Sequence, residues 1–109
     1  MQTVTQHVFI SFSHIDVVKA DRIAERLRSF GVPVWIDHTN LEPGSPDWEQ
    51  AIRDALDASL AVVYVATPNA RKSRAVKGEL ALAASKAIKI YPVWISSNYS
   101  PLCGVVTRV

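Results

Sequence analysis

Apolar residues recur along this chain in two patterns, and each pattern predicts one kind of element. Four short runs are apolar at nearly every position: residues 7–11, 34–36, 60–66 and 89–95. Runs of this length without a helical repeat are typical of buried β-strands. The run LAVVYVA (60–66) is apolar on both sides, so we expect it at the centre of a parallel sheet that helices cover on both faces.

Three longer segments between these runs repeat their apolar residues at helical spacing. Residues 17–30 form the first, with Asp16 as a candidate N-cap and Gly31 as a C-terminal stop. The second, 46–58, begins with a serine cap and a proline at the first helical position. The third spans 73–87. The spacing predicts the following inward residues: Val17, Ala20, Ile23, Ala24, Leu27, Phe30, Trp48, Ile52, Ala55, Leu56, Val76, Leu80, Ala83 and Ala87.

Strands and helices therefore alternate as β-α-β-α-β-α-β. This alternation predicts an α/β fold with a parallel sheet and right-handed crossovers. Pro92 lies inside the fourth strand and lacks a backbone N–H, which favours an edge or bulge position there. Residues 67–72 are expected to form a loop, and the tail 96–109 contains no clear element.

Composition narrows the class of protein. A chain of 109 residues, 49% hydrophobic and 20% charged, suits one globular domain and is too apolar for disorder. A net charge of +2 is too mild for a nucleic-acid-binding surface. The single cysteine, Cys103, excludes an internal disulfide, and Cys/His metal spacing is absent, so we expect a reducing, cytoplasmic setting. No signal peptide is visible, and no apolar run approaches the roughly 20 residues of a membrane span.

Candidate chemistry is expected where the strands end, because open parallel sheets bind ligands beyond the carboxyl ends of their strands. The segments 11–16, 37–47 and 67–74 and the residues after 95 converge there. They contain neither a glycine-rich phosphate loop nor a G-x-S-x-G elbow. A dehydrogenase, a P-loop NTPase or a serine hydrolase is therefore not indicated.

Several polar residues in these segments also have ordinary structural interpretations. His14 and His38 are better explained as loop residues than as acid–base catalysts. The position of Asp16 favours a helix cap, whereas Asp37 fits a loop cap and a functional role equally. A basic cluster opens the third helix: Arg71, Lys72, Arg74 and Lys77. It fits either a solvated face or a surface that attracts a diphosphate or an acidic partner.

Glu79 is the carboxylate that the helical pattern singles out. It lies beside the apolar stripe of the third helix and not opposite it. A carboxylate at such a margin is partly desolvated, which disfavours its charge and raises its affinity for a cationic ligand. Helical spacing alone still favours a solvated glutamate at the helix edge.

Four segments together resemble the Toll/interleukin-1 receptor (TIR) domain family. FISFSHID resembles its first box, F-(I/V)-S-(Y/F)-S-x-x-D. VPVWID with LEPGSPDWEQAI resembles the second strand, the BB loop and the following helix. AVVYVATPNARKSRAVKGEL resembles the third strand and the start of the next helix, and IYPVWI resembles the fourth strand. The match covers residues 8–95, and its style is closer to bacterial TIR domains than to animal receptors. It implies a flavodoxin-like sheet of order 2-1-3-4, with helices on both faces and a fifth strand missing from the pattern.

Many TIR domains cleave NAD⁺ to nicotinamide and ADP-ribose, or to a cyclic variant, in immune or antiphage defence or cell-death signalling. Their catalytic glutamate lies in a segment S-x-x-x-x-x-E-L, which the resemblance maps to Glu79. NAD⁺ is then the substrate, with no cofactor and no metal. By resemblance the substrate-binding residues are Phe12, Ser13, Asp16, Trp35, Asp37 and Ser73.

TIR enzymes of this type are activated by self-association, in which the BB loop of one copy completes the pocket of the next. The partners implied are NAD⁺ and other TIR domains in a homo-oligomer or filament, with no nucleic acid and no membrane. The resemblance also allows for a fused sensor domain. The self-association residues that it implies are His38, Leu41, Pro43, Gly44 and Trp48.

The sequence departs from the family pattern in two ways. Ala75 and Val76 stand where the family often has a tryptophan and a cysteine, which changes the expected pocket shape. The tail after residue 95 is too short for the further helix, strand and helix of most TIR domains. We therefore expect residues 1–109 to form a single TIR domain that is C-terminally truncated or part of a larger protein.

Two other functions remain open. The first is a non-catalytic TIR scaffold for homotypic TIR–TIR interactions. The presence of Glu79 favours the enzyme over this scaffold, because scaffolds are free to lose that residue. The second is an enzyme like the nucleoside 2-deoxyribosyltransferases, which shares the fold and a glutamate. The PGSPDW loop gives that interpretation no support.

Overall fold

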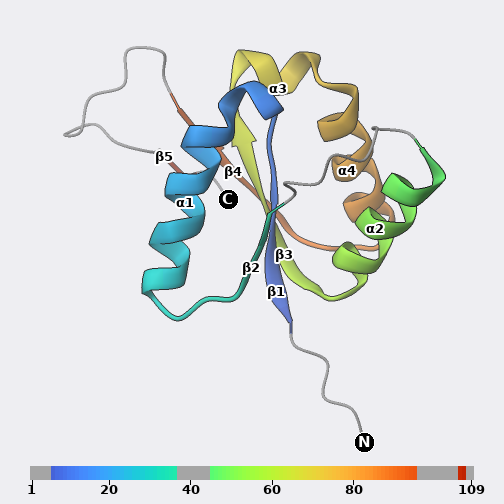
Figure 1. Ribbon diagram of the computed structural model, residues 1–109, viewed down its shortest axis with the longest axis horizontal. Helices are drawn as coiled ribbons and strands as arrows, with labels where there is room; N and C mark the ends of the chain where they lie inside the picture. The colour runs from blue at the N-terminus through green and yellow to red at the C-terminus, as the bar shows by residue number, and fades with distance from the viewer. Residues whose placement is uncertain (1–5, 37–44, 96–105, 108–109) are drawn as a thin grey trace, which may run out of the picture.

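A central sheet lies between helices on both faces, and its strand order is β2-β1-β3-β4-β5 (Figure 1). The structure, a computed structural model, describes residues 6–36, 45–95 and 106–107. Four strands run parallel, which confirms the predicted α/β fold and the order 2-1-3-4. They are β1 (His7–Ser11), β2 (Val34–Ile36), β3 (Ser59–Ala66) and β4 (Ile90–Trp94).

The sheet ends in a short strand that the sequence pattern did not indicate. β5 (Val106–Thr107) pairs antiparallel with Val93 and Trp94 of β4. Two residues are too few to show an alternation of apolar and polar positions, so the sequence pattern could not predict this strand. Pro92 pairs in register with Tyr64 of β3, and β5 does not extend alongside it.

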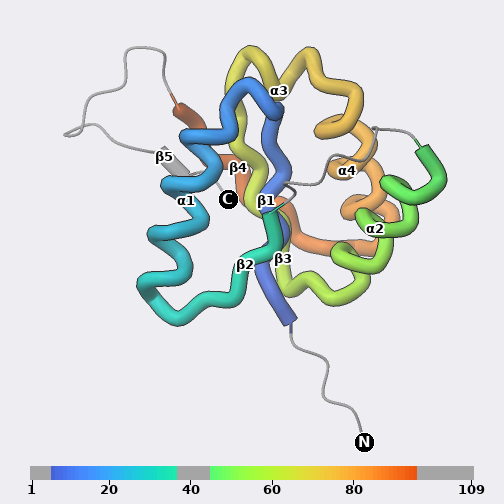
Figure 2. Tube along the Cα trace, in the orientation of Figure 1, coloured from blue at the N-terminus to red at the C-terminus, as the bar shows by residue number. Residues whose placement is uncertain are grey.

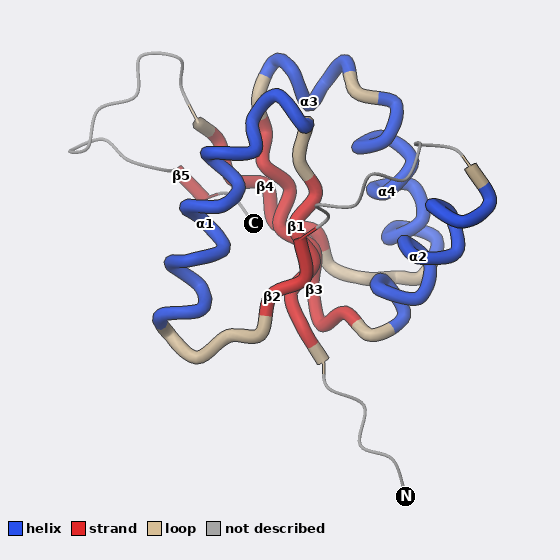
Figure 3. Tube along the Cα trace, viewed as in Figure 1, coloured by secondary structure: helices blue, strands red, loops and turns tan. Residues whose placement is uncertain are grey.

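Helix α1 (Val17–Ser29) covers one face of the sheet, while α2 (Pro46–Asp57) and α4 (Arg74–Ser85) cover the other (Figures 1 and 3). At the carboxyl end of the strands lie the 3₁₀ helix η1 (His14–Asp16) and the short helix α3 (Pro68–Lys72). In the described part of the chain, no helix is long and apolar enough to cross a membrane.

Helix α3 lies where the sequence predicts a loop, and that prediction is wrong. Thr67 caps the helix by accepting a hydrogen bond from the Ala70 amide at 3.0 Å, and Pro68 occupies its first turn. Five residues are too short for a helical period, so the cap and the proline were the signals present in the sequence.

Alternation along β1 divides the core into two clusters. Phe9 faces α2 and α4 and is grouped with Trp48 and Leu56, whereas Ile10 and Phe12 face α1. Figure 2 shows β1 and β3 running side by side between the two helical layers. The residues predicted to face inward from α2 are all buried, which confirms the pattern there: Trp48, Ile52, Ala55 and Leu56.

Two predicted inward residues are wrong, and both lie at helix ends. Phe30 is the C-cap of α1 and is 73% exposed, because Gly31 turns the chain away with φ +80°. Ala87 is exposed and lies beyond α4, which ends at Ser85, and its φ of 56° is left-handed. The helical spacing was extended beyond the residue at which each helix ends, and it no longer predicts which way a side chain faces there.

Candidate functional site

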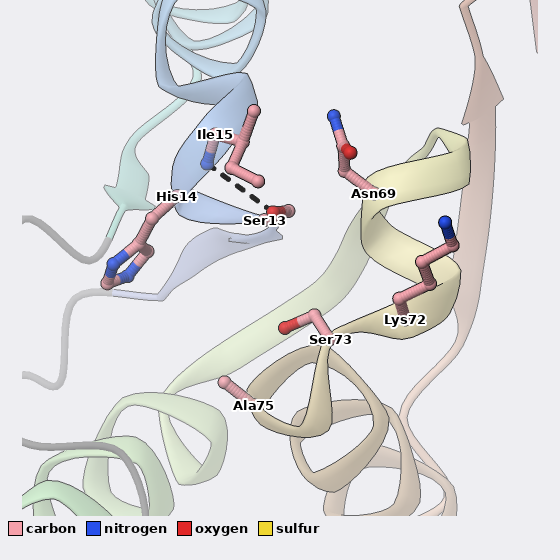
Figure 4. Close-up of a pocket in the computed structure, with 7 residues that line it drawn as sticks. All are labelled: Ser13, His14, Ile15, Asn69, Lys72, Ser73 and Ala75. Carbon is pink, nitrogen blue, oxygen red and sulfur yellow. Dashed lines mark hydrogen bonds between the residues drawn. The ribbon is translucent and has the colours of Figure 1, made fainter.

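A pocket of about 360 Å³ lies at the carboxyl end of the sheet, between η1 and the segment that joins α3 to α4 (Figure 4). This size falls within the usual range of small-molecule sites. Its position is the one expected for ligands of an open parallel sheet. The pocket is lined by Ser13, His14, Ile15, Asn69, Lys72, Ser73 and Ala75.

Two of the predicted substrate-binding residues line this pocket, and both also cap helices. The Ser13 hydroxyl accepts a bond from the Ile15 amide at 3.4 Å, at the start of η1. Ser73 accepts from the Val76 amide at 3.2 Å, at the start of α4. The partly positive N-terminus of α4 and the cationic residue Lys72 both border the pocket. This wall of the pocket favours an anionic group.

Asp16 lies behind the pocket wall and does not line it. Asp16 is 2% exposed and occupies the predicted N-cap position of α1, but its side chain makes no cap hydrogen bond there. The carboxylate accepts from the Thr67 hydroxyl at 2.5 Å and from the Asn69 amide at 3.3 Å. Lys19 adds a contact at 3.5 Å. Asp16 therefore joins η1 to the start of α3 and orients Asn69, which does line the pocket.

Glu79 is 5% exposed, so the interpretation as a solvated helix-edge residue is wrong. Val76 and Ala83, one turn to either side on α4, are also buried, so Glu79 lies on the buried face of this helix. The Ser11 hydroxyl at the end of β1 donates a buried hydrogen bond to Glu79 Oε1 at 2.7 Å. Glu79 is not among the residues that line the pocket; it lies one helical turn after the pocket-lining Ala75 on α4.

The aromatic residues predicted to bind substrate belong to the core. Phe12 is 5% exposed and packs in the cluster beneath α1, with its ring 5.9 Å from that of His14. Trp35 stacks on Phe9 with ring centroids 4.7 Å apart. Neither residue is among those that line the pocket.

The predicted self-association residues fall into two groups. The indole of Trp48 is 6% exposed within the core, so the structure corrects its assignment to a contact surface. The other predicted residues of this segment lie outside the described part of the chain: Asp37, His38, Leu41, Pro43 and Gly44. Cys103 also lies outside it.

The structure adds residues that sequence reasoning missed. Ser11 is a buried polar residue at the end of an apolar strand, and this contrast was its only signal. Asn69 lines the pocket and was not singled out from the sequence, whereas Lys72, which also lines it, belongs to the basic cluster named there. Within that basic cluster, Arg71 lies over the Trp94 ring, 5.5 Å from its centroid.

Candidate metal ligands are not gathered at this site. In the ranges 6–36 and 45–95, no three His, Cys, Asp or Glu side chains are close enough to hold a metal ion.

Comparison with known proteins identifies similar folds. A family model described as "TIR domain" matches residues 8–108. The TIR domain of the Toll-related receptor TRR-2 from Hydra magnipapillata superposes with a TM-score of 0.72 at 20% identity, over 89% of this chain and 76% of that one. A metazoan TIR-STING receptor from C. gigas gives 0.68 at 22%, over 91% and 34%.

The TIR domains of the activated Roq1 resistosome, which directly recognises the pathogen effector XopQ, give a TM-score of 0.67 at 22% identity, over 86% of this chain and 60% of that one. No curated protein sequence matches the chain. The chain spans less than two thirds of the Roq1 and TIR-STING chains, and identities this low establish the fold alone.

Proposed function

The chain belongs to the TIR domain family, and on this premise we propose that it is an NAD⁺ glycohydrolase of the bacterial, NAD-cleaving type. The reaction breaks the bond between nicotinamide and ribose and yields nicotinamide with ADP-ribose or a cyclic variant. One observation carries the proposal. Glu79 is a buried carboxylate on α4, one turn after the pocket-lining Ala75, at the position where the family motif has its catalytic glutamate.

The chemistry needs a single carboxylate. Nicotinamide leaves as a neutral ring and takes the electron pair of the C1′–N bond, so no general acid is required. The ribose that remains has oxocarbenium character, which a nearby anion and hydrogen bonds to the sugar hydroxyls stabilise. Water then attacks C1′ and loses a proton, or the adenine of the same molecule attacks and closes a ring. Glu79 is the anion in this scheme.

The pocket lining supports a dinucleotide substrate. Lys72 and the N-terminus of α4 favour the diphosphate. Ser13 and Asn69 offer hydrogen bonds to hydroxyl or amide groups of the substrate. In this proposal Ser73 and Asp16 act by shaping the wall, through the cap of α4 and the orientation of Asn69.

Activation by self-association is part of the proposal, with copies assembling head to tail into a homo-oligomer or filament. A role in immune defence follows from the same premise, since the Roq1 structure is described as recognising a pathogen effector.

A second candidate function is a non-catalytic TIR scaffold, which one observation favours. Ile15 of η1 and Val18 in the first turn of α1 lie three positions apart and are 77% and 63% exposed. Large apolar side chains exposed together mark surfaces that associate. A Val18→Asp variant that stays monomeric at concentrations where the wild type assembles, with no NAD⁺ cleavage by either protein, would support the scaffold.

Nicotinamide release from NAD⁺ tests the enzyme directly. Concentrated wild-type protein should release nicotinamide, and Glu79→Ala should not. The matched control is Glu25→Ala, because Glu25 is an exposed glutamate on α1. If the wild type releases no nicotinamide in any assembled state, the enzyme proposal is wrong. Equal release by the Glu79→Ala variant would remove Glu79 from the mechanism.

A further inference from the structure

Ser11 is the most deeply buried polar side chain of β1, with no exposed surface. It is the last residue of the strand, and it lies in register with Tyr64 of β3. A buried hydroxyl costs free energy unless it is hydrogen-bonded. The bond that Ser11 makes goes to Glu79, 68 positions later in the chain.

The contact is an ordinary hydrogen bond in length, with an oxygen–oxygen distance of 2.7 Å. Hydrogen bonds from a hydroxyl to an ionised carboxylate are stronger than bonds between neutral groups. A hydroxyl that donates to a carboxylate favours its charged form. The charged form is the one that stabilises an oxocarbenium-like ribose.

The two ends of the bond differ in how firmly they are held. Ser11 is fixed by a strand that pairs with β2 on one side and with β3 on the other. Glutamate has three side-chain torsions and loses rotamer freedom when it is ordered. A donor on the rigid sheet can therefore select one orientation of the Glu79 carboxylate relative to the pocket.

We propose that Ser11 is a positioning residue for the NAD⁺-cleaving reaction and holds the Glu79 carboxylate in its productive orientation. The inference rests on the proposed function, since it assigns a role within the same site. Ser11 itself does not contact substrate in this account, because it is fully buried and does not line the pocket.

The test compares steady-state nicotinamide release by wild type, Ser11→Ala and Ser11→Thr. A displacement of about 1 Å in a reacting group lowers rates by about 100-fold. We therefore expect Ser11→Ala to lower kcat by about 10- to 100-fold, with KM for NAD⁺ within about twofold of wild type. Ser11→Thr keeps the hydroxyl and should recover most of kcat. Should its extra methyl group prevent folding, Ser11→Cys supplies a weaker donor and an intermediate rate.

The matched control is Ser59→Ala at the opposite end of the sheet. The Ser59 hydroxyl is partly buried and donates to the carbonyl of Ala55 at 2.7 Å, at the end of β3 far from the pocket. This variant should keep the wild-type kcat. Circular dichroism and thermal unfolding give the folded fraction of each protein, so that kcat is expressed per folded molecule.

A Ser11→Ala kcat within twofold of wild type, per folded molecule, would overturn the positioning role. With that result, the proposed function still stands provided that the wild type releases nicotinamide and Glu79→Ala does not. Absence of nicotinamide release from the wild type in every assembled state would overturn the proposed function, and the positioning role with it.

Discussion

Two carboxylates are buried at the carboxyl end of the sheet, and they are held in different ways. Asp16 is bound by side chains of other loops and short helices, chiefly Thr67 and Asn69. Glu79 is bound by Ser11, which belongs to a central strand. The first arrangement joins two surface segments, and the second fixes a carboxylate against the rigid sheet. Burial is therefore common to both carboxylates, and they differ in which elements supply the hydrogen bonds described for them.

The largest effect is expected from Glu79→Gln. The amide keeps the shape of the side chain and can still accept from Ser11, but it carries no charge. We expect kcat for nicotinamide release to fall by about 10²- to 10³-fold. The midpoint of thermal unfolding should stay close to wild type. A Glu79→Gln variant that loses stability but keeps full activity would contradict the proposed catalytic role of Glu79.

Asp16→Ala should show the opposite profile. Removal of the carboxylate leaves the Thr67 hydroxyl and the Asn69 amide without their acceptor, so the free energy of unfolding should fall by about 2–4 kcal/mol. Urea unfolding measures this change. Asp54→Ala is the control, because Asp54 is exposed on α2, and its cost should be about 0.5 kcal/mol or less. Equal losses of unfolding free energy in Asp16→Ala and Asp54→Ala would show that the hydrogen bonds of Asp16 do not stabilise the fold.

Thr67→Val separates the network from its carboxylate. The substitution removes both the donor to Asp16 and the cap that accepts from Ala70, at similar side-chain volume. The expected loss in unfolding free energy is about 1–2 kcal/mol, from a lost cap and a buried hydrogen bond. In an Asp16→Ala background the same substitution should cost less, since the two residues share one bond. Strict additivity in urea unfolding would argue against a coupled network.

Lys19→Ala should have the smallest effect. Its ammonium lies 3.5 Å from Asp16, and its side chain is 47% exposed. Water and salt screen such a contact, so the expected change in unfolding free energy is at most about 0.5 kcal/mol. A loss as large as that of Thr67→Val would mean that the carboxylate is held by charge and not by the buried hydrogen bonds.

Much of the fold was predictable because hydrophobic periodicity reports which way a residue faces. The strands and the inward residues of α2, including Trp48 and Ile52, followed from this periodicity. The N-cap of α2 followed from the serine and proline at its start. Periodicity does not report where a helix ends, so Phe30 and Ala87 were placed inward in error. Segments of two to five residues, such as β5 and α3, are too short to show a period.

The site was less predictable because its contacts join distant parts of the chain. Local sequence placed Asp16 correctly at the N-cap of α1, but it could not show that the side chain bonds to residues 51 and 53 positions later instead of capping the helix. The helical wheel placed Glu79 beside the core stripe but could not show that Ser11 lies opposite it. Only the family resemblance singled out this glutamate as catalytic. The tertiary structure supplied its partner.

The most direct test of the central claim is chromatographic quantification of the products formed from NAD⁺ by concentrated protein. Wild-type chain and Glu79→Gln are compared at equal folded concentration, with Glu25→Gln as the exposed control. The account predicts nicotinamide and ADP-ribose, or its cyclic form, in equal amounts from the wild type and the control, and background levels from Glu79→Gln. Equal product from all three proteins, or none from the wild type in any assembled state, would contradict it.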